Sequence, residues 1–225
     1  MRVTLARRLG AELLGTALLL ATVVGSGIMA DRLCAGNVGL ALLCNALATG
    51  AGLVAFIHTF GPVSGAHFNP VVTLDAALGG GLGRRDALLY VGVQLVGALL
   101  GVAVADLMFE LPAYTASTHV RTGAAQWFAE AVATFGLLGT IAGVSRRTPR
   151  ATPFAVAAYI VAAYFFTAST SFANPAVTLA RAFTDTFAGI RPVDVPGFVL
   201  AQLVGGLAAT FTFRWLVPPA PEASA

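Results

Sequence analysis

Long apolar runs alternate with short polar links along almost the whole chain of 225 residues. Each run holds about 20 residues, the length that an α-helix needs to cross the ~30 Å hydrocarbon core of a bilayer. The charged residues cluster in the links between the runs, which is typical of a polytopic membrane protein. The pattern predicts six spans, at residues 9–30, 37–60, 86–107, 125–144, 152–170 and 195–217.

Two further apolar stretches are too short to span a bilayer, and they begin at Asn69-Pro70 and Asn174-Pro175. Asn is a favoured helix N-cap, and Pro suits the first helical turn, where its missing N–H costs nothing. About ten helical residues extend ~15 Å, which is half of the hydrocarbon core. The stretches therefore predict two re-entrant half-helices. The non-helical backbone before each Asn must be buried or line an aqueous path.

A sequence repeat divides the chain into two halves, each with three spans and one half-helix. Because three is an odd number, the halves must insert with opposite topology, and sites are expected near the bilayer midplane where they meet. We expect one transmembrane domain over 1–225, with repeat 1 at about 9–107 and repeat 2 at about 125–217. The matched motifs occur in the same order: AELLGT at 11–16 and AEAVAT at 129–134, NPVVTL at 69–74 and NPAVTL at 174–179, QLVGAL at 94–99 and QLVGGL at 202–207.

Composition and charge agree with membrane insertion. The chain is 57% hydrophobic and 10% charged, with a mean hydropathy of +0.83, whereas soluble domains carry about 25% charge. All 13 basic residues are Arg, and nine of them fall at the N-terminus, in the second and fourth links between spans, or at the end of the last span. The positive-inside rule predicts a multi-pass protein of the cell (inner) membrane with both termini cytoplasmic. These nine are Arg2, Arg7, Arg8, Arg84, Arg85, Arg146, Arg147, Arg150 and Arg214.

Composition also argues against other classes of function. No basic patch with interleaved aromatic residues occurs, so no nucleic-acid partner is expected. Two Cys and three scattered His are too few for a metal site, and no cofactor is expected. Cys34 and Cys44 are expected to be buried or lipid-facing thiols unless a turn brings them together. The apolar N-terminal stretch is long for a signal peptide, so we expect it to be retained as the first span.

The two Asn-Pro starts predict a particular electrostatic centre. Inverted insertion brings the N-termini of both half-helices together near the midplane, and each carries about half a positive charge and unpaired N–H donors. The Asn side-chain amides add further donors. A neutral solute with a lone pair can pass this point, whereas a cation is repelled. Asn-Pro can also simply start an ordinary helix, but two copies in matched repeat positions argue against that interpretation.

The motifs AELLGT, SGAHFNPVVTL, YVGVQLVGA, AEAVATFG, FANPAVTLAR and QLVGGL resemble those of the aquaporin, or major intrinsic protein, family along nearly the whole chain. The resemblance implies an all-α hourglass of six transmembrane helices and two half-helices, with one pore per subunit of a homotetramer in the lipid bilayer. It implies that the buried carboxylates of Glu12 and Glu130 hold the pore-lining loops. It also implies a central pore motif made of Asn69, Pro70, Val71, Asn174, Pro175 and Ala176.

The resemblance further implies a selectivity filter at Thr49, Ala162, Ser171 and Val177, from the spacing of the family's filter positions to the two Asn. The family usually has arginine at the fourth position and often an aromatic residue at the first, and this chain has neither. Arginine would add a positive charge, donors and bulk, whereas valine adds a short apolar wall. The filter is therefore expected to be wide, uncharged and partly apolar.

A filter of this kind is similar to that of a small aquaglyceroporin-like branch associated with bacterial arsenic resistance. The resemblance implies trivalent or methylated arsenicals as solutes beside water and glycerol-like polyols. A water-selective channel or a glycerol facilitator is the alternative. The aromatic pair that packs against glycerol in the facilitator branch is absent from the filter positions, and Thr178 stands where that branch usually has Asp.

Three more residues are candidates for the pore wall. Arg181 lies four residues after Val177 and thus about 6 Å further out on nearly the same helix face. It would line the outer vestibule, form an ion pair or point outward. Asp75 would border the inner mouth, or else be solvated or paired with an arginine. His67 would line the pore or pack as a hydrogen-bonded core residue.

Two other classes of membrane protein deserve comparison with a passive channel. Secondary transporters also use inverted repeats with broken helices, but coupling needs titratable groups at the midplane. Only Glu12, Glu130 and Asp75 are placed for that role, and the first two already have a structural explanation. An intramembrane enzyme needs a nucleophile with a base, or a set of metal ligands, and neither falls at membrane depth.

Overall fold

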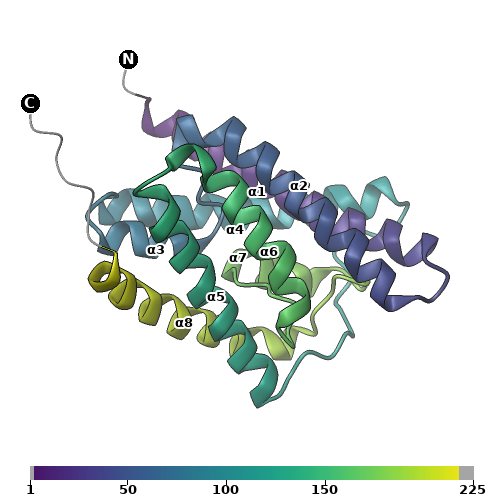
Figure 1. The fold of residues 1–225 in the computed structure, drawn as a ribbon. Helices are drawn as coiled ribbons and strands as arrows, with labels where there is room; N and C mark the ends of the chain where they lie inside the picture. Colours follow the sequence, from purple (N-terminus) through teal and green to yellow (C-terminus); the bar gives the residue numbers. More distant parts are fainter. Residues whose placement is uncertain (1–2, 218–225) are drawn as a thin grey trace, which may run out of the picture.

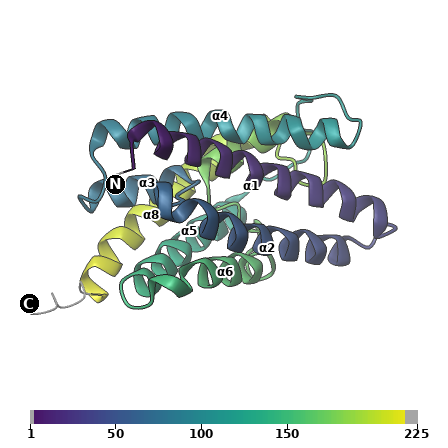
Figure 2. The ribbon, with the colours of Figure 1, turned by 90° about the horizontal axis from the view of Figure 1, so that it is seen from above.

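The computed structural model describes residues 3–217, and over that range the chain is built from helices (Figure 1). The first four helices form one half of the molecule and the last four form the other. Helix α1 begins and α8 ends at the same end of the bundle (Figures 1 and 2). The helices are α1 (Leu5–Leu33), α2 (Val38–Ser64), α3 (Pro70–Leu78), α4 (Arg84–Met108), α5 (Ala124–Ser145), α6 (Thr152–Phe166), α7 (Pro175–Ala180) and α8 (Val195–Leu216), with 3-10 turns at Pro149–Ala151, Arg181–Phe183 and Pro192–Asp194.

Five helices of the described range, α1, α2, α4, α5 and α8, are long and apolar enough to cross a membrane. The fifth predicted span, at residues 152–170, is shorter than expected, because α6 ends at Phe166 after 15 residues, or about 22 Å. Residues 167–174 leave the helix and lead to Asn174 in non-helical backbone. Conversely, α2 runs past the predicted end of its span, through Pro62 to Ser64, and stops at Gly65, whose φ is 92°.

Both predicted half-helices are present, and each begins at its Asn. Asn69 caps α3 by accepting a hydrogen bond from the Val71 N–H at 2.9 Å. Asn174 caps α7 by accepting from the Ala176 N–H at 3.0 Å and the Val177 N–H at 3.3 Å. With 9 and 6 residues, neither helix can cross a bilayer. The all-α membrane architecture with two re-entrant half-helices is thereby confirmed.

The packing of the helices repeats between the two halves. Helix α1 packs on α2 and α4, and α5 packs in the same way on α6 and α8, while α2 and α6 meet between the halves. Repeat-matched glycines allow the closest approaches. A Cβ on Gly97 would lie 2.4 Å from the carbonyl oxygen of Leu13, and one on Gly205 would lie 2.1 Å from that of Ala131. The glycine of the QLVG motif is therefore required by backbone contact between spans.

The half-helices sit inside this bundle, and each bridges the two repeats. Helix α3 packs on α4 of its own half and on α8 of the other, and α7 packs on α8 of its own half and on α4 of the other. The starts of α3 and α7 also contact each other. This arrangement brings Asn69 and Asn174 together at the middle of the molecule.

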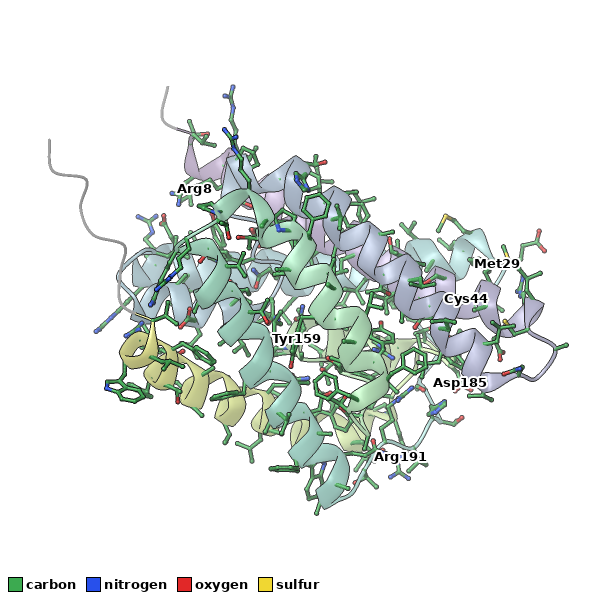
Figure 3. The ribbon with its side chains drawn as sticks, in the orientation of Figure 1. Arg8, Met29, Cys44, Tyr159, Asp185 and Arg191 are labelled. Atoms are coloured by element: carbon green, nitrogen blue, oxygen red, sulfur yellow. The ribbon has the colours of Figure 1, made fainter. Side chains whose placement is uncertain are left out.

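The outward faces of the long helices are apolar, as a lipid-facing surface requires. Leu14, Leu47, Leu88 and Phe211 are examples of large exposed hydrophobic side chains on four different helices. Figure 3 shows Arg8 at the end of the bundle where α8 ends, and Cys44, Asp185 and Arg191 at the opposite end. Cys34 is partly buried and Cys44 is exposed, and both are free thiols.

Candidate functional site

The two Asn side chains tie the half-helix starts to each other across the repeats. The Asn69 amide donates to the carbonyl of Ala173 at 2.8 Å, and the Asn174 amide donates to the carbonyl of Phe68 at 2.8 Å. Each side-chain oxygen is already used as an N-cap acceptor. Both side chains line the same cavity. One N–H of each amide is thus bound to the opposite loop, and the second is available to a molecule in the cavity.

Glu12 holds the loop before the first Asn. One carboxylate oxygen accepts from the Ser64 hydroxyl at 2.6 Å and from the His67 N–H at 2.9 Å. The other accepts from the Phe68 N–H at 2.7 Å and from the Gln94 amide at 2.8 Å. The carboxylate is fully buried, and these four donors compensate the cost of burying its charge.

Glu130 makes the equivalent contacts in the second half. It accepts from the N–H groups of Phe172 and Ala173 at 2.8 and 2.9 Å and from the Gln202 amide at 2.6 Å. It too is fully buried. All these donors belong to the loop and α8, so the carboxylate fixes a backbone segment and does not face the cavity. The geometry supports the structural role proposed for both glutamates.

Sequence reasoning missed the residues that join each glutamate to its half-helix. The Gln94 amide donates to Glu12 and also to the Thr73 hydroxyl at 2.9 Å, and the Gln202 amide donates likewise to the Thr178 hydroxyl at 2.8 Å. Thr73 and Thr178 in turn donate to the carbonyls of the two Asn residues. The signal was present, because Gln and Thr recur at matched positions of the QLVG and NPxVTL motifs.

The segments before both Asn residues have an unusual backbone that also repeats. Ala66 and Phe68 have φ of 50°, and Ser171 and Ala173 have φ of 52° and 48°. Non-glycine residues in this left-handed region cost about 1 kcal/mol or more each. The strain persists because the glutamates bind the intervening N–H groups. The alternation gives a non-helical chain whose Phe68 and Ala173 carbonyls meet the Asn amides at the cavity.

A single cavity of about 270 Å³ passes both Asn residues. One end is lined by Asp75, Ser145 and Thr152, and the other by Thr49 and Arg181. Between them, the wall opposite the two loops is mostly apolar. Its hydrophobic side chains come from α1, α2, α5 and α6, and they are Leu19, Val23, Leu53, Ile57, Leu137, Ile141, Val156 and Ile160.

Three of the four predicted filter residues, Thr49, Ser171 and Val177, line this cavity, but Ala162 does not. Ala162 is exposed on the outer side of α6, and Tyr164 faces the cavity instead. Residues two apart on an α-helix are rotated by about 200° from each other, so Ala162 and Tyr164 point to opposite faces of α6. The predicted position is therefore two residues too early in the chain. Tyr164 also meets Thr49, with 3.3 Å between the two hydroxyl oxygens.

His67 and Asp75 both face the cavity and both have hydrogen-bond partners. His67 contacts the Thr73 hydroxyl through Nδ1 at 3.1 Å, and its ring packs on Tyr90 with 5.4 Å between centroids. His67 thus lines the cavity and is at the same time a packed, hydrogen-bonded residue. The Asp75 carboxylate accepts from the Thr210 hydroxyl at 2.7 Å, and the Asp75 backbone carbonyl accepts from Arg214 at 3.4 Å, so Arg214 contacts the residue without forming an ion pair.

Arg181 is buried at 3% exposure and lines the cavity. Its Nε donates to the carbonyl of Ala188, and its guanidinium carbon lies 3.4 Å from the centroid of the Phe172 ring. Neither the expected ion pair nor the outward-facing position is found for this residue within the described range. Its guanidinium is part of the cavity wall.

No group of three His, Cys, Asp or Glu side chains within residues 3–217 is placed to hold a metal ion. The lining of the cavity within that range consists of amide, hydroxyl and guanidinium donors, the His67 ring, the Asp75 side chain, backbone carbonyls and apolar walls.

An apolar helical bundle whose two half-helices meet inside a shared cavity defines a polytopic membrane channel. Comparison with known proteins agrees with this class of protein. The model of the "Major intrinsic protein" family matches residues 1–153. The chain is 58% identical over 216 residues to "Aquaglyceroporin AqpS" of Rhizobium meliloti (strain 1021), covering 96% of this chain and 92% of that protein. The chain belongs to the major intrinsic protein family, which comprises the aquaporins and aquaglyceroporins.

More distant matches also extend over nearly the whole chain. "Aquaporin AqpM" of Methanothermobacter marburgensis is 29% identical, over 95% of this chain and 98% of that protein. Among solved structures, the aquaglyceroporin from Plasmodium falciparum matches with a TM-score of 0.70 and 21% identity. That match covers 96% of this chain and 98% of the other, and it supports the hourglass fold.

Proposed function

We propose that the chain is a passive channel for water and small uncharged solutes, including glycerol-like polyols and trivalent or methylated arsenicals. One observation carries the proposal. A single cavity of about 270 Å³ runs past Asn69 and Asn174, where both half-helices begin. Water and small neutral molecules fit such a cavity, and its amide donors replace the hydrogen bonds that these molecules lose on leaving bulk water.

The centre of the cavity discriminates by charge. The N-termini of α3 and α7 meet there, and each contributes about half a positive charge. Asn69 and Asn174 orient their amide donors toward the passing molecule. The glutamates that fix the loops lie away from the cavity, so they do not neutralise this potential by direct contact. A cation or hydronium ion would lose its hydration without gaining a compensating partner.

The constriction at Thr49, Tyr164, Ser171 and Val177 sets the size and chemistry of the solute. Thr49, Tyr164 and Ser171 supply hydroxyl groups, and Val177 supplies an apolar wall. This mixture suits solutes that carry oxygens on a compact body, such as polyols and arsenous acid. The name of the similar protein, an aquaglyceroporin, supports the polyols. The arsenicals rest on the resemblance of the filter to the branch associated with arsenic resistance.

We propose the same single transmembrane domain and orientation as the sequence indicates, with both termini cytoplasmic in the inner membrane. In support, α1 begins and α8 ends at one end of the bundle. Arg8 and Arg214 lie near these ends, in the helices α1 and α8. A homotetramer with one pore per subunit is part of the proposal and follows from family membership.

Stopped-flow swelling of proteoliposomes tests the proposal with water, glycerol, urea and arsenous acid measured side by side. We expect faster swelling than in protein-free vesicles for water, glycerol and arsenous acid. Swelling by water alone would favour a water-selective channel, and by water and glycerol without arsenous acid, a glycerol facilitator. Solute flux that collapses with the proton gradient would favour a secondary transporter and refute passive conduction.

A further inference from the structure

The guanidinium of Arg181 lies in the cavity wall without an ion-pair partner among the described residues. Its position is fixed on two sides, by the bond from Nε to the Ala188 carbonyl and by the face of the Phe172 ring. Phe172 is itself held by Glu130 through its N–H. These two contacts fix the orientation of the guanidinium, and its two terminal nitrogens remain available to a molecule in the cavity.

The direction of α7 explains how the Arg181 side chain comes to line the cavity. Helical side chains lean toward the N-terminus of their helix and cover the turn before their own Cα. Helix α7 begins at the centre of the molecule with Pro175, so this lean points inward, past Val177. An arginine is long enough to cover a rise of about 6 Å between residues four apart. The Cα of Arg181 thus lies about one turn after that of Val177, whereas its guanidinium lies in the cavity wall against Phe172.

A second arginine contacts the same ring. The guanidinium carbon of Arg121 is 5.1 Å from the Phe172 centroid, and Nε donates to the Gly189 carbonyl at 2.8 Å. The two guanidinium groups thus share Phe172 at this end of the cavity. Two buried carboxylates lie nearby, and both are engaged elsewhere. Glu130 of α5 accepts from the loop backbone, and Asp194 accepts from the Arg121 N–H and is paired with Arg191. The guanidinium groups of Arg121 and Arg181 have no ion-pair partner within the described residues.

Ser171 is a second polar residue at this end of the cavity. It is 3% exposed and lines the cavity, and its hydroxyl oxygen has no partner within the described residues. An unpaired buried hydroxyl is costly. Ser171 and Arg181 thus both leave hydrogen-bonding groups without a protein partner beside the cavity.

We propose that Arg181 is the specificity-determining charge of this constriction, supplied one helical turn after the position where Val177 stands. It repels cations, and together with Ser171 it binds the oxygens of neutral hydroxylated solutes. Val177 then widens the passage without making it uncharged. This inference rests on the proposed channel function and corrects the expectation of a filter without positive charge.

The test uses the full chain in proteoliposomes, with proton leak followed by an internal pH dye and water and glycerol flux followed by swelling. Arg181→Leu should raise proton leak about tenfold or more, because one charge near the path is lost. The ratio of glycerol to water flux should also change, because the guanidinium that binds solute oxygens is lost, and Arg181→Lys should keep most of the proton exclusion. The matched control is Arg32→Leu, which removes a guanidinium stacked on Phe109 at 5.1 Å, outside the cavity. Wild-type leak in a folded Arg181→Leu protein that still conducts water would overturn the inference.

A chemical rescue serves if Arg181→Leu does not fold. Arg181→Cys is made in a background with Cys34→Ala and Cys44→Ala and is then modified with a cationic or a neutral thiosulfonate reagent. The cationic adduct should lower proton leak toward the wild-type value, and the neutral adduct should not. Equal effects of the two reagents would overturn the inference. Wild-type vesicles that conduct neither water nor glycerol would instead overturn the proposed function on which the inference rests.

Discussion

Replacing Glu130 with Gln tests whether a buried carboxylate holds the loop that leads into α7. The carboxylate accepts three hydrogen bonds, from the Phe172 N–H at 2.8 Å, the Ala173 N–H at 2.9 Å and the Gln202 amide at 2.6 Å. Bonds to a charged acceptor contribute about 1.5–3 kcal/mol each. A glutamine has one acceptor oxygen, and its NH₂ group would face a donor. With one to two bonds lost, we expect a destabilisation of about 3–5 kcal/mol.

The assay for Glu130→Gln is thermal unfolding in detergent together with water flux in proteoliposomes. We expect the Tm to fall by about 10 °C and water flux to fall with it, because Ala173 and its neighbours leave their left-handed conformations. Glu12→Gln should have a similar effect, since Glu12 accepts four equivalent bonds. Glu110→Gln, at an exposed position, is the control and should change neither quantity. Wild-type Tm and flux in Glu130→Gln would refute the reasoning.

Three further predictions follow from other contacts. Gly205→Ala should lower the free energy of unfolding by about 1–3 kcal/mol, because the new Cβ meets a backbone carbonyl of α5; unchanged thermal stability would contradict this. Tyr164→Ala should speed glycerol flux while Ala162→Phe leaves it unchanged in swelling assays, and the reverse would restore Ala162 to the filter. Hydrogen bonds from Thr118 lower the pKa of the Asp185 carboxyl in the folded protein. The ionised carboxylate therefore stabilises the loops fully above its ordinary pKa of about 3.9, and this stabilisation is lost as the pH falls through the lower pKa of the folded protein. Thermal unfolding between pH 6 and 3 should show this loss, and Asp185→Asn should reduce the pH dependence.

The repeat made most of the fold predictable from the sequence. Three pairs of matched motifs indicated two inverted halves, and the Asn-Pro dipeptides indicated where α3 and α7 begin, since capping depends on local chemistry. The ends of α2 and α6 were not predicted well. Apolar residues continue through both ends, and the helices stop where the loops must bend toward Asn69 and Asn174.

The sequence predicts the candidate site well where the site depends on repeated motifs. The prediction was wrong where the direction of a side chain depends on rotation about a helix. Ala162 was chosen by a fixed spacing to Asn174, but the spacing depends on where α6 ends, and Tyr164 takes the place. The sequence predicts only the position of the Arg181 Cα, whereas the contacts of its long side chain with Ala188 and Phe172 depend on the tertiary fold. The partners Gln94 and Gln202 were visible as repeated residues, but only the structure showed which groups they join.

The central claim is that a wide constriction with an apolar side passes neutral solutes larger than water. Val177 lines the cavity and is 5% exposed, so an arginine there would narrow the cavity, which Arg181 also lines. The most direct test is the ratio of glycerol to water permeability in proteoliposomes of the wild type and of Val177→Arg. We predict that Val177→Arg retains water flux and lowers this ratio about tenfold or more, because the arginine adds bulk and a positive charge to the path of the solute. Equal loss of both fluxes, or an unchanged ratio, would contradict the account.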